Sequence, residues 1–155
     1  MAARDGDGWL HCNCGNKHWG LNGAAGILLV RGKEILLQHR APWVHNGDTW
    51  GIPGGARDSH ESPTQGAIRE AIEETGIDPA FVVPLHIFSD DHGNWRYDTV
   101  IARATQDLIA HEVNDESHEV RWVDVDEVAD LNLHTSFANS WPALRKILND
   151  FIGPR

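Results

Sequence analysis

The chain has 155 residues, is 41% hydrophobic and 23% charged, and carries a formal net charge of −10 with neutral histidines. A chain of this length forms one ordinary globular domain, whose core buries roughly two-thirds of the unfolded surface without disulfides or a structural metal. The acidity argues against binding to nucleic acids or anionic membranes, since both require a basic face. An anionic ligand would need another means of recruitment, such as a divalent cation.

The sequence shows no sign of export or membrane insertion. Residues 1–9 lack the apolar stretch and small-residue cleavage site of a signal peptide. The longest apolar run, Ala24 to Val30, is far shorter than the ~20 residues that cross a bilayer. Cys12 and Cys14 are too few for a disulfide framework and too close in sequence to pair well with each other. We therefore expect a soluble protein of the reducing cytoplasm.

Apolar segments and turn signals predict one domain spanning 1–155. Segments with strand character are, in chain order, 9–12, 17–19, 24–30, 34–38, 49–52, 81–89, 95–104 and 119–123. The first two predict an amino-terminal hairpin, within an extension (1–22) packed on the domain. Helices are expected over 62–75 and 141–151, with one helical turn over 126–129. Because strands and helices are mixed without regular βαβ alternation, we predict an α+β fold or a sandwich-like α/β/α domain.

The clearest element is the helix over 62–75. Ser62 is a natural N-cap, Pro63 occupies the first helical position, Gln65 completes a capping box, and Gly76 ends the helix. On a 3.6-residue wheel, three carboxylates fall within a sector of about 100°. These are Glu70, Glu73 and Glu74.

The opposite side of this helix is apolar and faces the core. It consists of Ala67, Ile68, Ala71 and Ile72. On the acidic side, like charges repel each other, and glutamates near the carboxyl end of a helix oppose its macrodipole. Compensation could come from Arg69, which can reach Glu61 or Glu73, or from a hard dication that prefers oxygen ligands. Judged alone, the acidic side fits a solvated surface equally well.

The surrounding spacing favours a functional role for these carboxylates. The pattern G-x5-E-x7-R-E-x2-E-E-x-G is formed by Gly55, Glu61, Arg69, Glu70, Glu73, Glu74 and Gly76. Seven fixed identities would coincide by chance on the order of once in 10⁸ windows. The pattern, which Ile77 closes, resembles the Nudix box of the Nudix hydrolase family. It departs from the family at Ala71, where a larger aliphatic residue is usual.

The resemblance extends beyond the box. Pro53-Gly54-Gly55 is similar to the family's turn before the catalytic helix, and residues 35–40 resemble a strand of MutT-type members that ends in arginine. The resemblance implies a Nudix-type α/β/α sandwich with a mixed sheet. It also implies hydrolysis of a nucleoside diphosphate linked to another group, with Mg²⁺ or alternatively Mn²⁺. Metal ions would neutralise the charge of the diphosphate and activate the attacking water. They would also align this water with the leaving group.

The resemblance assigns the metal to the helix and to the turn before it. The implied ligands are Glu70, Glu73, Glu74 and the backbone carbonyl of Gly54. Arg69 would orient the helix with Glu61 as its partner. Alternatively, Glu61 reaches a second metal through water.

The resemblance leaves two candidate positions for the general base. Either Glu70 or a downstream carboxylate would take the proton from the attacking water. In MutT-like enzymes a glutamate before a late strand approaches the metal, which favours Glu116, with Glu119 second. A solvated loop and a strand-edge charge are the alternatives for these two residues. The implied catalytic residues are Arg69, Glu70, Glu73 and Glu116.

Three residues are candidates for substrate contacts. Arg40, at a strand end, could bind a phosphate bidentately, although a plain surface arginine is the alternative. Gly55 belongs to the turn beside the helix. His134 falls where MutT-like proteins have a loop near the nucleobase, and its alternative is a capping or core role. Trp43 and Trp95 could stack on a base, or simply pack in the core or at its rim.

The amino-terminal hairpin contains another set of potential metal ligands. Its members, His11, Cys12, Cys14 and His18, are all accepted zinc ligand types. The spacing argues against zinc, because zinc knuckles usually place two or more residues between paired cysteines and no second pair exists. We therefore expect a hairpin that carries incidental thiols.

The implied activity is that of a MutT-like nucleotide pyrophosphohydrolase. An oxidised guanine nucleoside triphosphate or diphosphate is the first candidate substrate, with the monophosphate as product.

A non-catalytic nucleotide sensor is a rival function, but the presence of all four box glutamates opposes it. An isomerase is disfavoured, because it would need a cysteine and a glutamate in the pocket and this chain has cysteines only in the amino-terminal hairpin. ADP-ribose is disfavoured by Gly93, where that branch has proline, and dinucleoside polyphosphates and the oligomeric state stay open.

Overall fold

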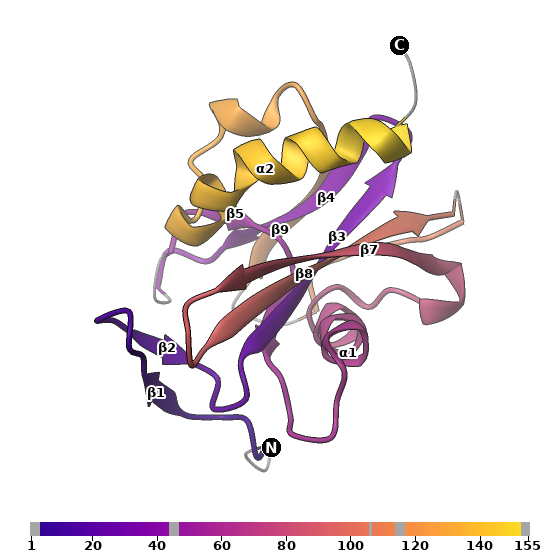
Figure 1. The fold of residues 1–155 in the computed structure, drawn as a ribbon. Helices are drawn as coiled ribbons and strands as arrows, with labels where there is room; N and C mark the ends of the chain where they lie inside the picture. Colours follow the sequence, from indigo (N-terminus) through magenta and orange to yellow (C-terminus); the bar gives the residue numbers. More distant parts are fainter. Residues whose placement is uncertain (1–3, 44–46, 106, 114–116, 153–155) are drawn as a thin grey trace.

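The computed structural model describes residues 4–43, 47–105, 107–113 and 117–152 (Figure 1). In chain order its elements are β1 (Trp9–His11), β2 (Lys17–Trp19), β3 (Ala24–Arg31), β4 (Glu34–Arg40), β5 (Trp50–Gly51), β6 (Gly54–Ala56), α1 (Pro63–Thr75), the 3-10 turn η1 (Pro79–Phe81), β7 (Val82–Asp91), β8 (Arg96–Ala104), β9 (Ser117–Asp124), the 3-10 turn η2 (Val128–Asp130) and α2 (Thr135–Ile152). Each segment predicted from the sequence overlaps one of these elements.

A mixed sheet forms the middle of the molecule. Five of its strands lie in the order β5-β4-β3-β8-β7, while β6 pairs with β3 and β9 pairs with β4. Strands β3 and β8 are parallel, and the other pairs are antiparallel. The strands predicted over 24–30 and 34–38 are central, as expected. The structure therefore confirms the α+β class and the mixed sheet.

Helices α1 and α2 cover opposite faces of this sheet (Figure 1). The alternation along β3 shows why, because successive side chains point to opposite faces of a strand. Leu28 and Val30 pack in one core cluster with α2, whereas Ala25, Ile27 and Leu29 pack in a second cluster with α1. Since both faces are covered, β3 is buried along almost its whole length. This arrangement is the predicted α/β/α sandwich.

Helix α1 begins and ends where its capping residues predict. The Ser62 hydroxyl accepts a hydrogen bond from the backbone N–H of Gln65 at 3.1 Å, and the Gln65 side chain accepts one from the N–H of Ser62 at 2.9 Å. Gly76 ends the helix in the left-handed region with φ 66°, where glycine is favoured. Because these signals are local, the sequence is sufficient to place the helix.

Two local predictions around α1 are wrong. The sequence predicts a turn over 53–55, but Gly54–Ala56 forms strand β6, because its backbone pairs antiparallel with the start of β3. Ile72 was assigned to the apolar side, yet it is 38% exposed. The helix contacts the sheet through the small, fully buried Ala67 and Ala71, and Ile72 lies outside that contact.

Helix α2 is longer than predicted. It begins at Thr135 rather than at 141 and continues through Pro142, which has no N–H to donate within the helix. Buried Phe137 and Trp141 on the first turns pack into the core, and this tertiary packing compensates for the missing hydrogen bond. Within the described part of the chain, neither helix combines the length and apolarity needed to cross a bilayer.

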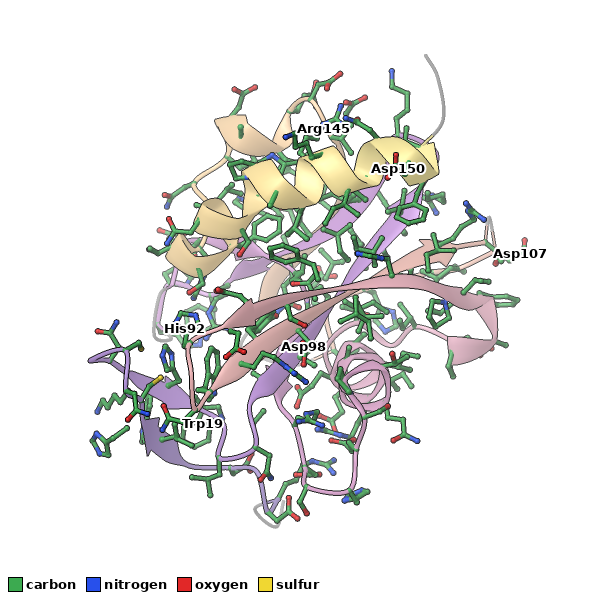
Figure 2. The ribbon with its side chains drawn as sticks, in the orientation of Figure 1. Trp19, His92, Asp98, Asp107, Arg145 and Asp150 are labelled. Carbon is green, nitrogen blue, oxygen red and sulfur yellow. The ribbon has the colours of Figure 1, made fainter. Side chains whose placement is uncertain are left out.

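Strands β1 and β2 form the predicted hairpin, which packs beside the turn between β7 and β8. The N–H of Asn13 donates to the side chain of Asn94 at 2.8 Å, and Asn94 donates back to the carbonyl of His11 at 3.3 Å. Figure 2 labels Trp19 on the hairpin and His92 on the facing turn, on the same side of the molecule. The hairpin is therefore attached to the sheet through backbone and side-chain hydrogen bonds.

Candidate active site

The acidic side of α1 lies against the segment that enters β6. Glu74 accepts one hydrogen bond from the N–H of Gly54 at 2.9 Å and one from the amide of Gln38 at 3.3 Å. Glu70 lies so close to Gly55 that a Cβ at this glycine would come within 2.6–2.8 Å of the Glu70 carboxyl atoms. Only glycine fits at this position without displacing Glu70, so the two elements hold the carboxylates at fixed positions.

These carboxylates occupy an environment that disfavours their charged form. Withdrawal from water raises the pKa of Glu74 to about 8, and the neighbouring Glu70 charge adds to the shift. Burial also raises the pKa of Glu70, although the Arg69 guanidinium opposes the shift. Burial raises the pKa of the Tyr97 hydroxyl as well, with further contributions from Glu74 and Glu70. A cation placed between these groups would favour the ionised carboxylates.

The donor set fits a hard dication. Three carboxylates from one helix stand next to a backbone segment, and Mg²⁺ and Mn²⁺ prefer such oxygen ligands. In addition, Gln38 Oε1 is buried and has no hydrogen-bond partner among the described residues, although its amide group contacts Glu74. An unpaired buried oxygen beside the carboxylates is a further place for a cation or for its bound water.

Arg69 contacts all of the box glutamates except Glu74. Its Nε and Nη2 donate to Glu61 at 2.6 and 2.8 Å, and its Nη1 donates to Glu70 at 2.9 Å. The same Nη1 lies 3.4 Å from Glu73. Hydrogen bonds from Arg69 hold the pKa of Glu61 below its ordinary value. The predicted reach of Arg69 to Glu61 and Glu73 is therefore present, and the pairing fixes the acidic side of the helix.

A contact that the sequence did not indicate comes from the amino-terminal segment. The Arg4 guanidinium donates to Glu73 at 2.5 Å and to Asp58 at 3.4 Å. Glu73 is more exposed than Glu70, with 32% of its side chain accessible against 17%. Arg4 therefore partly neutralises the outermost of the three carboxylates.

A cavity of about 560 Å³ opens next to this group, between the sheet, the start of α2 and the hairpin. Its volume lies within the range of small-molecule sites. Its wall is rich in aromatic rings and imidazoles: Trp9, His18, Trp19, His92, Trp95, Tyr97 and Phe137. Lys17 and Arg40 supply positive charge, while Gly54 and Gly55 connect the cavity to the carboxylates of α1.

All three residues predicted to contact the substrate line this cavity. Arg40 stands at the end of β4, where the pairing with β9 shifts register between His39 and Arg40. Gly55 lies directly beside the Glu70 carboxyl group. His134 lines the cavity and also caps α2, because its Nδ1 accepts a hydrogen bond from the N–H of Ser136 at 3.2 Å. The capping alternative for His134 is thus realised together with exposure to the cavity.

The structure does not bring every candidate to the site. Glu116 lies outside the described residues. Glu119 on β9 is half-buried, accepts a hydrogen bond from Arg121 at 3.1 Å and does not line the cavity. Trp43 is 69% exposed and is also absent from the wall, whereas Trp95 belongs to it.

Several wall residues had no signal in the sequence. Gln38 follows two buried leucines at the end of a predicted strand, and only the fold shows that it contacts Glu74. The hairpin residues Trp9, His18 and Trp19 reach the cavity because the hairpin docks on the turn between β7 and β8. Such long-range contacts leave no periodic pattern in the chain.

A sheet of this order between two helices, with the carboxylate-bearing helix following the glycine segment, is a Nudix domain. The family model "NUDIX domain" matches residues 20–147, and the chain belongs to this family. It is a Nudix hydrolase, as predicted, and β1 and β2 precede the matched residues.

Two relatives and one solved structure share most of this chain. It is 49% identical to the Mycobacterium tuberculosis protein named "Putative 8-oxo-dGTP diphosphatase 3", over 91% of this chain and 70% of that protein. It is 44% identical to a Bifidobacterium longum nucleoside triphosphate pyrophosphatase/Nudix hydrolase fusion protein, over 94% of this chain and 32% of that protein. The crystal structure of RenU, a Nudix hydrolase from M. smegmatis, superposes with a TM-score of 0.86 at 43% identity, covering 97% and 99% of the two chains.

Proposed function

We propose that this Nudix hydrolase converts a nucleoside triphosphate or diphosphate to the monophosphate in a Mg²⁺-dependent reaction, and that an oxidised guanine nucleotide is its substrate. The observation that carries the proposal is the position of the α1 carboxylates, which Gly54 and Gly55 connect directly to an aromatic-lined cavity. The name of the M. tuberculosis relative supports the choice of substrate, since it specifies 8-oxo-dGTP.

Four groups would hold the metal, namely Glu70, Glu73, Glu74 and the carbonyl of Gly54. Their support is the donor chemistry described above, together with the unpaired Gln38 oxygen beside Glu74. When bound, Mg²⁺ or Mn²⁺ would supply neutralisation of the diphosphate charge and activation of the attacking water. Arg4 contacts one oxygen of Glu73, so the other oxygen would be the one offered to the ion.

The other residues of the chain position the reactants. Arg69 holds Glu70 and Glu73 on the metal side of the helix through its pairing with the buried Glu61. Glu70 is the candidate base, because its carboxylate lies beside Gly55 on the cavity wall, where it can accept the proton of the attacking water. Glu116 stays the second candidate for the base. Water attacks one phosphorus, the base takes its proton, and the terminal phosphate or diphosphate departs.

The phosphates and the base would bind on different parts of the cavity wall. Arg40 would contact a phosphate, because its planar guanidinium can donate two parallel hydrogen bonds to phosphate oxygens. Gly55 would allow the phosphate chain to approach the backbone closely, and His134 would face the base from the start of α2. Trp95 and Tyr97 offer flat surfaces on which a purine could stack.

The hairpin belongs to the same functional unit under this proposal. Residues 1–22 would be an extension packed on a single domain of 1–155, since Trp9 and Trp19 complete one wall of the cavity. The partner of the protein would be a small nucleotide rather than a nucleic acid or a membrane, in line with its net charge of −10.

A nucleotide panel tests the proposal. The purified chain is incubated with Mg²⁺ and, separately, with 8-oxo-dGTP, dGTP, ADP-ribose and a dinucleoside polyphosphate, and the products are identified by phosphorus NMR. We expect the highest kcat/KM for 8-oxo-dGTP and formation of the monophosphate. Hydrolysis of another compound alone would refute the substrate choice. Tight binding without hydrolysis of any compound would support the nucleotide sensor instead.

A further inference from the structure

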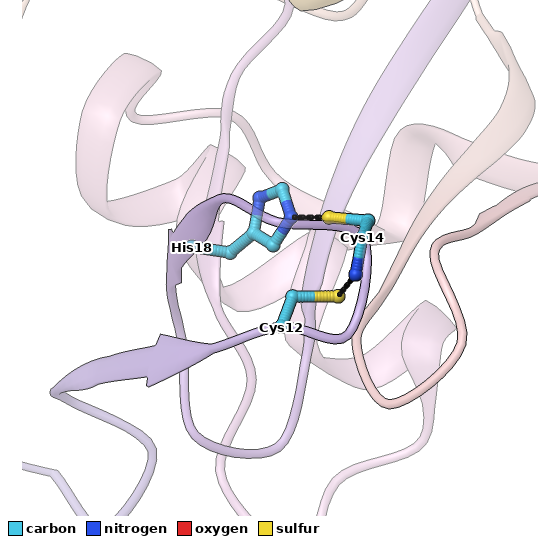
Figure 3. Close-up of side chains that lie close together, drawn as sticks. All are labelled: Cys12, Cys14 and His18. Atoms are coloured by element: carbon cyan, nitrogen blue, oxygen red, sulfur yellow. Dashed lines mark hydrogen bonds between the residues drawn. The ribbon is translucent and has the colours of Figure 1, made fainter.

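The loop of the hairpin brings two thiols and an imidazole together (Figure 3). The ligand atoms of Cys12, Cys14 and His18 all lie within 4.8 Å of one another. The Cys14 sulfur is 3.2 Å from Nε2 of His18, and the N–H of Cys14 points to the Cys12 sulfur at 3.5 Å. The spacing of the two cysteines did not predict this proximity to His18.

The backbone of the loop holds this arrangement. The N–H of Cys12 donates to the carbonyl of Asn16 at 2.9 Å, and the N–H of Gly15 donates to the carbonyl of Cys12 at 3.1 Å. Gly15 has φ +96°, a conformation that other residues rarely adopt, and this glycine allows the chain to turn back within the loop. The tight turn therefore places His18, on β2, beside both cysteines.

Neighbouring residues orient the three side chains. The Cys12 thiol is 8% exposed and donates to the carbonyl of His92 at 3.2 Å. The His18 ring stacks on Trp95 with a centroid separation of 4.1 Å and an interplanar angle of 11°. The stacking fixes the orientation of the His18 ring before an ion binds, as outer-shell partners do in metal sites. The hydrogen bond of Cys12 would be given up when its thiol loses the proton.

We propose that Cys12, Cys14 and His18 bind one Zn²⁺ ion, with the fourth position taken by water. Two thiolates and an imidazole favour Zn²⁺ over the hard cations that suit the α1 carboxylates. Binding displaces the two thiol protons into solvent, so the uptake of one Zn²⁺ releases two protons.

The ion would stabilise one wall of the nucleotide cavity. His18, His92 and Trp95 all line that cavity, and the loop of the hairpin contacts the turn that carries His92 and Trp95. A metal bound within this loop would therefore hold the loop, and with it His18, in a fixed position on the cavity wall. The site is distinct from the box carboxylates, and it stands independently of the substrate proposed above.

Cobalt titration tests this site without an activity measurement. The full-length protein, treated with chelator and kept reduced, is titrated with Co²⁺, because thiolate ligands produce a near-ultraviolet charge-transfer band that carboxylates cannot produce. We expect the band to saturate at one equivalent and to disappear when Zn²⁺ is added. The Glu74→Gln variant should keep the band, since its substitution affects only the α1 site.

Substitutions identify the ligands. Cys14 is exposed, so Cys14→Ser should fold normally and lose the band, with Zn²⁺ affinity at least 100-fold weaker. His18→Ala should weaken Zn²⁺ binding at least tenfold. His11→Ala is the matched control, because His11 is an exposed histidine on the same hairpin outside the cluster, and it should bind Zn²⁺ as the wild type does. Absence of the band in the wild type, or its persistence in Cys14→Ser, would overturn the proposal.

Discussion

Replacing Glu61 with glutamine removes the charged partner that Arg69 contacts through hydrogen bonds of 2.6 and 2.8 Å. Glu61 is 8% exposed and the Arg69 side chain 17%, so the guanidinium loses a partner in a poorly solvated place. Removing one member of a buried ion pair costs about 3–5 kcal/mol. Because glutamine keeps one acceptor oxygen and Arg69 keeps Glu70, we expect a decrease of about 2–4 kcal/mol in the free energy of unfolding.

Chemical and thermal unfolding of the metal-free protein measure this loss. In a domain of this size, 1 kcal/mol shifts Tm by roughly 2–4 °C, so Glu61→Gln should lower Tm by roughly 5–15 °C. The matched control is Glu127→Gln, since Glu127 is exposed and its side chain makes no capping hydrogen bond. The control should change the free energy of unfolding by less than about 0.5 kcal/mol.

The pH dependence adds a second readout. Arg69 holds the pKa of Glu61 below its ordinary value, so the pair stabilises the fold fully above the ordinary carboxyl pKa. That contribution is lost as the pH falls through the lowered pKa, and the difference between wild type and Glu61→Gln should shrink there. A loss at neutral pH no larger than that of the Glu127→Gln control would refute the reasoning.

Three other substitutions test separate parts of the site. Gly55→Ala introduces a Cβ within 2.6–2.8 Å of the Glu70 carboxyl, and kinetic assays should show a kcat at least tenfold lower with a smaller change in KM. Glu74 has a pKa raised to about 8, so ionisation destabilises the metal-free fold as the pH rises toward 8. Urea titrations should therefore show Glu74→Gln gaining stability over wild type between about pH 5 and 8, and no gain would contradict the raised pKa. Trp95→Ala should raise KM for the nucleotide severalfold with little change in kcat, and an unchanged KM would exclude stacking on this ring.

The sequence predicts best where the signals are local. Ser62, Gln65 and Gly76 define the limits of α1 because capping depends on neighbours three or four residues apart. The common direction of Glu70 and Glu73 follows from helical periodicity alone. The family resemblance rests on this same segment, which explains why the family and the fold were both predicted correctly.

Contacts between distant segments are not encoded in such patterns. The pairing of Arg4 with Glu73 joins residues 69 positions apart, and the docking of Asn13 on Asn94 joins residues 81 positions apart. The strand β6 also depends on a distant partner, because residues 54–56 pair with β3. The hairpin could be predicted from its turn residues, but its place on the cavity wall depends on these tertiary contacts.

The cysteine cluster shows the same limit. Spacing rules compare a sequence with known zinc motifs, and a single residue between Cys12 and Cys14 fits none of them. In three dimensions the relevant quantity is the distance between ligand atoms, and the turn at Gly15 brings the sulfurs close to His18. The backbone conformation of the loop was therefore the missing information.

The measurement that tests the central claim most directly compares Mg²⁺-dependent hydrolysis of 8-oxo-dGTP by wild type, Glu73→Gln, Glu74→Gln and Glu127→Gln. If the α1 carboxylates hold the metal, the wild type and the Glu127→Gln control hydrolyse the nucleotide only when Mg²⁺ is present. The Glu73→Gln and Glu74→Gln variants then lose at least 100-fold in kcat/KM, which corresponds to about 2.7 kcal/mol of transition-state stabilisation. Wild-type activity in both α1 variants would contradict the account.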